Sequence, residues 1–514
     1  MVKVDSSSKL ISALANGEVL VELEPGNYFV SGLNIRANGT VIQSTDPANR
    51  AKIICSANSS SDMLLASGVS GITLKDLILD GNFRNQSGAV RGSSRPRLAR
   101  FRNCSNVLIQ GVHMCNGALD GFRFDTLTNG KLLDNTCELL GHDAFYLMYW
   151  CRNVLVKGNK FDINTNSGTR VSMGGTDITI EDNEYFSDNI TVSTGPCIEI
   201  DKQWKERGIG FKNIIIKNNR MHNTEGSGIW AFMDAPNKVE NFQIIGNTID
   251  RTGQYDSGYN GYSNAGIAIG RIPAIVEGNT ISNVPNAVII NEFKYPGTEK
   301  YTVQFKNNTV KNCAVGFRVD SPRGYIAGDG NTISDVRTLK YGETKNITIN
   351  AGPVDNVATN EIIKAVVTIT DARGWTGTQE IDLETVEVSP LDNGRVTVKY
   401  SAGGLYGNRT YNLPASTNAS PTGSDWLVGL AITREAGTQE HSFILPGIQG
   451  SGLNEFKLRT KDGRYGQADL NIVLVEPDGE EEPTPKQIKI VHKVTMFVDN
   501  IAVLEKEYVE ESTV

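Results

Sequence analysis

The stretch "VLVKGNKF" at residues 154–161 is repeated, in its order of residue types, along two-thirds of the chain. Near copies are "ITIEDNEY" at 178–185, "IIIKNNRM" at 214–221, "FQIIGNTI" at 242–249, "AIVEGNTI" at 274–281 and "VQFKNNTV" at 303–310. Each copy has a short β-type run, then Gly, Asp or Asn, then an Asn, and an apolar residue two positions later. The residues that fill this Asn slot are Asn135, Asn159, Asn183, Asn219, Asn247, Asn279, Asn308 and Asn331.

The spacing of the slot is that of a repeat with loops of variable length. Successive Asn residues are separated by 24, 24, 36, 28, 32, 29 and 23 residues. Asn tolerates the left-handed backbone of a tight turn, and its amide can bond the equivalent Asn of the next repeat. The repeat therefore predicts a ladder of stacked amides, and Leu77 and Val112 occupy the same slot in two earlier repeats.

A second short strand follows each Asn turn, as in "GFRFD" from Gly121, "CIEID" from Cys197 and "GFRVD" from Gly316. Two or three short strands per repeat, with no helical period, are too few for a propeller blade and lack the spacing of a leucine-rich repeat. They fit one coil of a parallel β-helix, in which each strand pairs with its counterpart about 4.8 Å away. Crossovers between parallel strands are right-handed in nearly all cases, which predicts a right-handed coil.

With this repeat, the chain resembles the pectin-lyase-like superfamily of β-helices over roughly residues 5 to 335. The superfamily includes pectate lyases, polygalacturonases, alginate epimerases and phage tailspikes. The adjacent aspartates of polygalacturonases, the calcium-binding clusters of many pectate lyases and the Asp-Pro-His signature of alginate epimerases are missing. The chain is closest in character to tailspike depolymerases, which rely on scattered carboxylates in a groove.

The predicted fold class is all-β, with a right-handed parallel β-helix, then a β-sandwich-like module and a short C-terminal β segment. A Ser-capped helix and strand should close the open end of the coil. The expected divisions are a cap at 1–30, the β-helix at 31–338, the β-sandwich-like domain at 345–476, an acidic Pro-containing linker at 477–486 and a β-hairpin for attachment at 487–514.

Bulk composition narrows the classes of partner. The 514 residues carry a net charge of −8 with both signs interspersed, which predicts no nucleic-acid binding. No apolar run is long enough to enter a membrane, and no leader precedes the coil, which favours release in a virion over secretion. The seven cysteines are expected to be buried free thiols. The histidines lack zinc spacing, so no metal and no cofactor is predicted.

Outward positions of the second strand should form columns up one side of the coil, because strand side chains alternate. On the middle repeats these columns mix cations, carboxylates and large aromatics. Aromatic faces stack on sugar rings and Arg binds sugar carboxylates, so the mixture predicts a polysaccharide groove, although the aromatics could instead cover a loop or a trimer interface. The predicted substrate-binding residues are Arg123, Asp125, Tyr149, Trp150, Trp204, Trp230 and Phe232.

The sequence is compatible with two alternative sets of catalytic residues. Glu199 and Asp201 lie two apart on one strand, which puts their carboxyl groups about 6 to 7 Å apart and permits an inverting hydrolase. The same pair could simply neutralise Arg170 and Lys202. Elimination or epimerisation would instead need a cation and a proton-transfer pair.

The proton-transfer set is drawn from Tyr146, Arg170, Lys202 and His142. His142 in "GHDAFY" is about as well explained as a hydrogen-bonded turn residue.

The sequence thus favours a carbohydrate-recognising protein, a tailspike-type depolymerase that acts as hydrolase or lyase. One alternative is a non-catalytic virion fibre that binds glycans, and another is a secreted uronate lyase or epimerase. The expected partners are a polysaccharide or cell-surface glycan, two further copies in a homotrimer, and virion proteins at the C-terminal segment. The expected location is a virion tail or fibre, or otherwise outside the cell.

Overall fold

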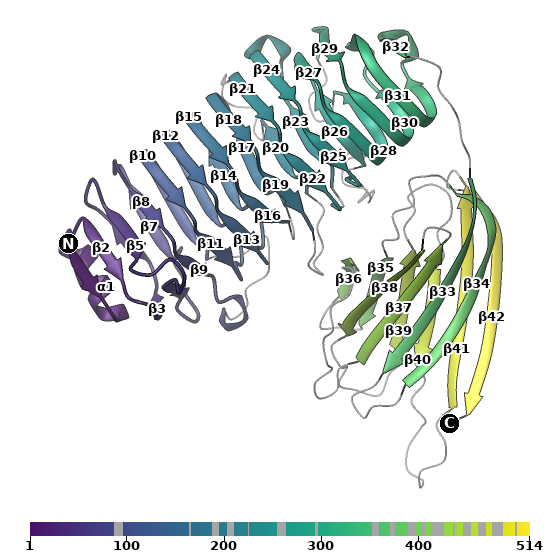
Figure 1. Ribbon diagram of the computed structural model, residues 1–514, viewed down its shortest axis with the longest axis horizontal. Coiled ribbons are helices and arrows are strands. Elements are labelled where there is room, and N and C mark those ends of the chain that lie inside the picture. Colours follow the sequence, from purple (N-terminus) through teal and green to yellow (C-terminus); the bar gives the residue numbers. More distant parts are fainter. Residues whose placement is uncertain are drawn as a thin grey trace. The chain divides into compact units, whose positions relative to one another are not determined.

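The computed structural model describes residues 1–86, 96–163, 166–187, 195–202, 210–224, 226–253, 264–292 and 297–351, and the backbone of strands between Thr359 and Thr513. The chain divides into two compact units, one of Met1–Ser187 and Ser193–Asn356, the other made mainly of Val357–Val514. The first unit is a coil of parallel strands that stack in the order of the sequence (Figure 1). Each strand pairs with its counterpart one coil further along.

Three faces form the wall of the coil. The first face contains β4 (Leu33–Ile35), β7 (Leu64–Ser67), the start of β10 (Ala99–Gln110) and of β12 (Phe122–Leu133), β14 (Phe145–Met148), β17 (Thr169–Ser172), β20 (Ile198–Asp201), β23 (Ile229–Phe232), β26 (Ala265–Gly270), and the ends of β28 (Thr280–Asn291), β30 (Thr309–Val319) and β31 (Gly324–Gly342).

The second face begins at the N-terminus and ends past residue 340. It contains β1 (Val2–Val4), β2 (Leu20–Leu23), β5 (Val41–Ser44), β8 (Thr73–Lys75), the ends of β10 and β12, β15 (Cys151–Lys157), β18 (Gly175–Glu181), β21 (Phe211–Lys217), β24 (Val239–Ile245), β27 (Ala274–Glu277), β29 (Tyr301–Lys306), the start of β31, and β32 (Ile347–Ala351).

The third face follows the Asn turn. It contains β3 (Asn27–Val30), β6 (Lys52–Cys55), β9 (Ile78–Asp80), β11 (His113–Cys115), β13 (Thr136–Glu138), β16 (Lys160–Asp162), β19 (Glu184–Phe186), β22 (Arg220–His222), β25 (Thr248–Asp250), the start of β28 and β30, and the middle of β31. Parallel pairing thus extends beyond the expected 31–338 at both ends. Short 3₁₀ turns are η1 (Phe83–Asn85), η2 (Pro236–Lys238) and η3 (Thr344–Asn346).

The Asn ladder is present as predicted. The Asn159 side-chain amide donates to Asn183 Oδ1 at 2.8 Å, and its Oδ1 accepts from the backbone N–H and the amide of Asn135, each at 2.9 Å. The same contacts continue from coil to coil up to Asn331. The amide of Asn159 also donates to the carbonyl of Leu132 at 2.9 Å. Every ladder Asn is at most 8% exposed, so the ladder satisfies buried polar groups inside the wall.

The left-handed residue of the turn is not the Asn itself, which corrects the expectation from the sequence. The positive φ belongs to the residue before it, at 68° for Gly158 and 55° for Asp182, for example. This explains why the preceding position is restricted to Gly, Asp or Asn.

A second, solvent-facing ladder was not predicted. The amide of Asn153 donates to Asn129 Oδ1 at 2.9 Å, and Asn129 donates to Asn106 Oδ1 at 3.0 Å. All three residues have φ between 51° and 58° and lie six positions before the main slot. The sequence therefore contains two ladders of stacked Asn side chains, one buried and one exposed.

The core fills the interior of the coil. Its aromatic part lies behind β10 to β19, where Phe145 meets Phe161 edge-to-face at 5.6 Å and Phe161 stacks on Tyr185 at 4.9 Å. At the N-terminal end, where a cap was expected, α1 (Ser7–Ala15) packs Leu10 and Leu14 against this core. Its N-cap residue Ser6 makes no side-chain capping bond.

All seven cysteines are free and buried, as expected. Among the described residues, the structure contains no helix with the length and hydrophobicity that a membrane span requires.

The second unit is antiparallel. One four-stranded sheet contains β34 (Thr376–Val388), β33 (Thr359–Thr370), β37 (Trp426–Arg434) and β38 (Gly437–Leu445). The other contains β36 (Gly407–Asn412), β35 (Val396–Ala402), β39 (Asn454–Thr460) and β40 (Asp469–Leu474). The predicted final hairpin is present as β41 (Gln487–Val498) paired with β42 (Ile501–Thr513).

Candidate active site

Length variation between coils is concentrated beside the first face. From β8 onward, the turn between a second-face strand and the separate third-face strand that follows it is two residues long, as at Gly158-Asn159 and Gly278-Asn279. Only the first two such turns are longer, at residues 24–26 and 45–51. The connection from the third face to the first spans residues 163–168 between β16 and β17, but residues 251–264 between β25 and β26. Loops shape binding sites on rigid scaffolds, so the first face is where this coil carries its specific features.

The predicted columns are in register on this face. Arg123, Tyr146, Arg170, Glu199 and Trp230 are direct partners on the successive strands β12, β14, β17, β20 and β23. The alternate residues of these strands, such as Phe145, belong to the coil core. The residues of the column therefore project from the other side of the sheet, as the alternation predicts.

The central rungs are buried, which the sequence did not predict. Tyr146 is 3% exposed, Arg170 5%, Glu199 3% and Asp201 1%. The charges at these positions are therefore not solvated. Buried charges have to be paired and hydrogen-bonded, and the contacts of this group follow that rule.

Arg170 is the centre of the cluster. Its Nη2 lies 2.6 Å from Asp201 Oδ2 and 3.0 Å from Glu199 Oε1, and its Nε donates to Asp201 Oδ1 at 3.3 Å. Its guanidinium also lies over the ring of Tyr146, 5.0 Å from the centroid. The two carboxyl groups thus share one guanidinium nitrogen, so the pair of Glu199 and Asp201 does not flank the water-sized gap that an inverting pair needs.

Glu199 keeps its proton. Burial raises the pKa of Glu199 to about 8, reinforced by Asp201 and Asp143 and opposed by Arg170. Its Oε2 accepts a hydrogen bond from the Ser167 hydroxyl at 3.1 Å. At neutral pH this side chain is a carboxylic acid that can donate a proton.

His142 links two further carboxylates. Its Nδ1 lies 2.6 Å from Asp120 Oδ1 and 3.0 Å from Asp143 Oδ2. Burial alone would lower the pKa of His142, but Asp143 and Asp120 raise it to about 10. The imidazole is therefore a cation at neutral pH, and Asp143 in turn accepts from Asn166 Nδ2 at 2.7 Å and the Ser167 backbone N–H at 3.0 Å.

The charged network continues toward the N-terminus. Arg97 Nε lies 2.7 Å from Asp120 Oδ2, and its Nη1 lies 3.4 Å from Asp62 Oδ1. Arg170 Nη1 lies 3.8 Å from Asp143 Oδ2. A line of alternating charges therefore runs from Asp62 to Asp201 along the corner before the first face and onto that face.

Asp62, Arg97, Asp120 and Asp143 were missed by the sequence reasoning. A signal was present, because each lies two residues before the first apolar residue of a first-face strand, as in "LDGF" from Leu119 and "HDAF" from His142. A charged residue that recurs at a coil corner indicates a buried ladder of ions when its neighbours are apolar.

The Asp120, His142 and Asp143 donor atoms lie within 4.8 Å of one another, the spacing of a metal site. The protonated imidazole, Arg97 and Arg170 already neutralise these carboxylates. The group does not fit an added cation.

Arg123 and Asp125 lie beside this network. Arg123 Nε donates to Asp125 Oδ1 at 2.8 Å, and its guanidinium lies 5.2 Å from the centroid of the Tyr146 ring. The second Asp125 oxygen accepts from Arg100 at 2.7 Å. These predicted binding residues are therefore adjacent to the cluster.

The predicted aromatic residues fall in two places. Tyr149 and Trp150 form the corner after β14 with φ of 60° and 67°, a strained conformation for bulky residues, and Trp150 is 42% exposed under the guanidinium of Arg152 at 4.7 Å. Trp230 and Phe232 on β23 lie 5.0 Å apart, with Trp230 half-buried. Trp204 lies outside the described residues.

Lys202 is not brought to Glu199 or Asp201. It is 1% exposed, and its Nζ forms an ion pair with Asp234, which also lies 3.2 Å from Lys238. Of the six predicted catalytic residues, the structure gathers the other five, since His142 joins through Asp143.

Comparison with known proteins concerns the fold. Residues 21–185 match the model of a family described as right handed beta helix region. A search of curated protein sequences found no match. The catalytic domain of a GH87 α-1,3-glucanase in complex with nigerose is 14% identical, over 68% of this chain and 67% of that chain, with a TM-score of 0.48.

Two other similar structures have polysaccharides in their descriptions. An alginate lyase from Paenibacillus sp. is 15% identical over 67% of this chain and 98% of its own, with a TM-score of 0.37. The tailspike protein gp49 of Acinetobacter baumannii bacteriophage Fri1, a capsular polysaccharide depolymerase, is 11% identical over 86% of this chain and 82% of its own, with a TM-score of 0.37. The family match and the stacked parallel coil show that the first unit of this chain has the right-handed parallel β-helix fold.

Proposed function

We propose that this protein is a polysaccharide depolymerase that hydrolyses glycosidic bonds at the first face of its β-helix. The observation that carries the proposal is Glu199, a carboxyl group with a pKa of about 8, held between the Ser167 hydroxyl and the Arg170 guanidinium. Glycoside hydrolysis needs such a group, because the leaving oxygen must be protonated near neutral pH. Glu199 is the general acid in this proposal.

The second carboxylate of the reaction is Asp143 in this proposal, because Asp201 shares one guanidinium nitrogen of Arg170 with Glu199. Asp201 has both oxygens on Arg170, which suits a residue that orients the guanidinium. Asp143 is connected to Glu199 through Ser167. The Ser167 backbone N–H donates to Asp143, and the Ser167 hydroxyl donates to Glu199. Asp201→Asn and Asp143→Asn variants separate the two, because loss of the water-activating carboxylate lowers kcat more than loss of a positioning one.

Hydrolysis is favoured over elimination by the state of Tyr146. Burial raises the pKa of Tyr146 above its usual range, so the phenol holds its proton and is a poor base at neutral pH. Lys202, the other predicted participant in elimination, pairs with Asp234 instead. A lyase would need a base at this position with a lowered pKa.

Sugar rings would be held by the aromatic residues nearest the cluster. Trp230 is the direct strand partner of Glu199 and is half-buried. Trp150 is exposed at the corner after β14, two coils before the strand of Glu199. Their ring faces can stack on the apolar face of a pyranose.

Glycan binding without cleavage is the second candidate. It is favoured by the burial of Glu199 and Asp201, both of which contact the Arg170 guanidinium. In that case the network is a structural spine and only the partly exposed side chains meet the glycan.

Assembly as a homotrimer on a phage virion, with the C-terminal hairpin as the attachment segment, completes the proposal. The strand-rich second unit supports a role in holding chains together, since an isolated hairpin is only marginally stable. Light scattering of the full chain should give three times the mass of 55.9 kDa, and a monomer would contradict it.

The activity is tested with a panel of capsular polysaccharides, alginates and α-glucans, by measuring reducing ends and absorbance at 235 nm (wavelength of the unsaturated product). New reducing ends without absorbance are expected. Absorbance would indicate elimination and contradict the assignment of Glu199. Binding without new ends would support the second candidate.

A further inference from the structure

We propose that Arg100, Arg102 and Arg123 form a subsite on the first face for the carboxylate groups of an acidic polysaccharide. The inference rests on the proposed function and adds the substrate class. Arg100 and Arg102 are on β10 and Arg123 is on β12, and Arg100 and Arg123 are direct partners across the two strands.

The three guanidinium groups converge on one carboxylate. Arg100 Nη2 lies 2.7 Å, Arg123 Nε 2.8 Å and Arg102 Nε 3.7 Å from the oxygens of Asp125. In the described part of the chain, Asp125 is the acidic residue within ion-pair distance of these three groups. Three positive charges therefore face one negative charge.

This excess of positive charge would destabilise a cluster that had only a structural role. The side chains of Arg100 and Arg123 are only 15% exposed, and like charges held together in a partly buried place repel one another. Burial lowers the pKa of Arg100, Asp125 opposes this, and the charges of Arg123 and Arg102 lower it further, while against burial Asp125 holds the pKa of Arg123 above its ordinary value. A second carboxylate, supplied by a ligand, would balance the group.

The geometry suits a carboxylate that arrives from solvent. Arg102 is 53% exposed, while Arg100 and Arg123 are fixed by their bonds to Asp125. Guanidinium groups bind carboxylates through two parallel N–H···O bonds, which a neutral hydroxyl cannot match. One exposed guanidinium group and two that are held by Asp125 make a preorganised anion site.

The distance between the arginine subsite and Glu199 indicates where along a bound polymer the carboxylate would lie. Arg123, Tyr146, Arg170 and Glu199 are consecutive rungs, so Arg123 lies roughly 14 Å from Glu199 at about 4.8 Å per rung. Beyond Trp230 the same column continues with Ala268 and Ile289, and the next cation, Arg318, is paired with Asp320 on its own coil. The cationic subsite is thus on the N-terminal side of the proposed acid, and the chain of sugars would run along the stack.

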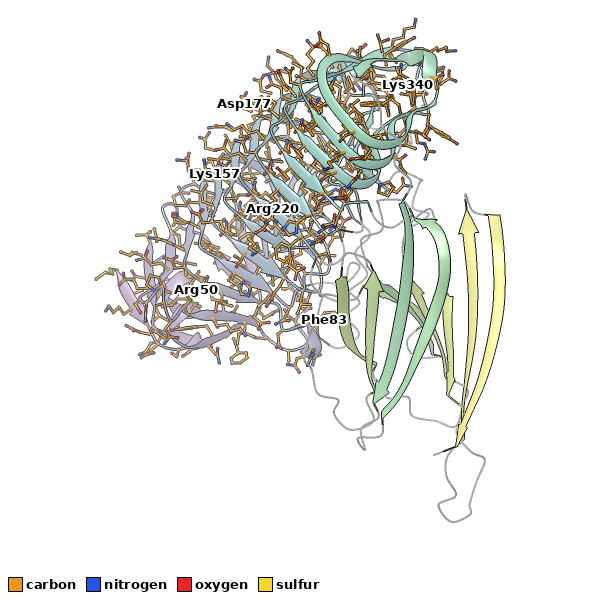
Figure 2. The ribbon with its side chains drawn as sticks, turned by 45° about the vertical axis from the view of Figure 1, so that its right-hand side comes forward. Arg50, Phe83, Lys157, Asp177, Arg220 and Lys340 are labelled. Carbon is orange, nitrogen blue, oxygen red and sulfur yellow. The ribbon has the colours of Figure 1, made fainter. Side chains whose placement is uncertain are left out.

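The test compares Arg102→Gln with Arg220→Gln. Arg220, labelled in Figure 2, is a matched control because it is 64% exposed, pairs with Glu184 at 2.9 Å and lies on the third face. The probes are alginate, polygalacturonate and hyaluronate, each beside its carboxyl-reduced form. Binding is measured by titration calorimetry at two salt concentrations.

The native form of at least one polymer should bind, and its carboxyl-reduced form should bind more weakly. Arg102→Gln should weaken native-polymer binding roughly 3- to 5-fold and leave the reduced polymer unchanged, and the effect should shrink at high salt. Arg220→Gln should equal wild type. Binding of none of the native polymers, equal binding of native and reduced forms, or equal effects of the two variants would overturn the subsite.

Failure of the subsite and failure of the proposed activity are distinguishable. Cleavage of a neutral polymer with an unchanged KM in Arg102→Gln would remove the subsite and keep the depolymerase. Arg102-dependent binding of a uronate polymer without new reducing ends would keep the subsite and remove the depolymerase.

Discussion

The amide of Asn159 donates to Asn183 Oδ1 at 2.8 Å, while the backbone N–H of Asn159 donates to the same oxygen at 2.9 Å. One side-chain oxygen therefore satisfies two buried donors of the preceding coil. This relationship repeats from Asn135 to Asn331 and fixes the register of all three faces.

Removing one amide from the middle of the ladder should be strongly destabilising. Asn159→Ala leaves the backbone N–H and amide of Asn135, and the carbonyl of Leu132, without their partner. Buried unsatisfied groups cost about 1–3 kcal/mol each, so a loss of roughly 2–4 kcal/mol in the free energy of unfolding is expected. Urea unfolding measures it.

The control is Asn153→Gly in the exposed ladder, where glycine keeps the left-handed backbone and water replaces the lost bond. It should change stability by less than about 1 kcal/mol. Equal losses for the two variants would contradict a structural role specific to the buried ladder.

The left-handed position is tested at Gly278, which has φ of 65°. A Cβ there would have its nearest neighbour at 3.9 Å, so the cost of Gly278→Ala is conformational, about 1 kcal/mol. Gly278→Asn should lose less, since Asn218 and Asn307 adopt this conformation in other coils. An alanine variant as stable as wild type would show that the turn does not require the left-handed backbone.

The fold could be predicted because the repeated sequence pattern indicates the turns and strands of each coil. The recurring Asn predicted the coiled repeat, and its uneven spacing predicted loops of variable length. The alternation of residues in strands such as β14 and β17 predicted the columns of outward side chains. The left-handed residue was assigned one position too late, because both residues of the Asn-Asn pairs at 218–219 and 307–308 satisfy the same preference.

The candidate site was predicted less completely. Alternation placed Arg170 and Glu199 on one face, but it cannot say that the face is buried, because burial depends on what packs over it. The link through Asp143 and His142 was missed because corner residues follow no strand period. Lys202 was misplaced for the same reason, since it follows the last residue of β20 and turns to Asp234.

His142 should make the stability of the fold depend on pH. Its folded pKa of about 10 lies above the ordinary value of 6.5, so its stabilising contribution is complete below pH 6.5 and is lost as the pH rises through about 10. Wild type should lose stability between about pH 6.5 and 10, and His142→Gln should lose less over that interval. Parallel curves in thermal or urea unfolding would contradict the ion pairs with Asp120 and Asp143.

Ser167 should tune the proposed acid. Its hydroxyl hydrogen bond stabilises the ionised form of Glu199 and so lowers the pKa of that carboxyl. In Ser167→Ala, the alkaline limb of the rate profile should move to higher pH, whereas a variant with a merely loosened structure would lose activity at every pH. An alkaline limb that stays in place or moves down would contradict the contact.

The most direct test of the account is the pH dependence of kcat/KM for polysaccharide cleavage, in wild type, Glu199→Gln and Glu181→Gln. Glu181 on the second face is the matched control, since it is also an ion-paired glutamate on a strand of the coil, with Lys157 and Lys217 as its partners. Wild type and Glu181→Gln should lose activity roughly tenfold per pH unit above about 8, and Glu199→Gln should be at least about 100-fold slower at pH 6. Undiminished cleavage by Glu199→Gln, or activity that rises above pH 8, would contradict a proton donated by Glu199.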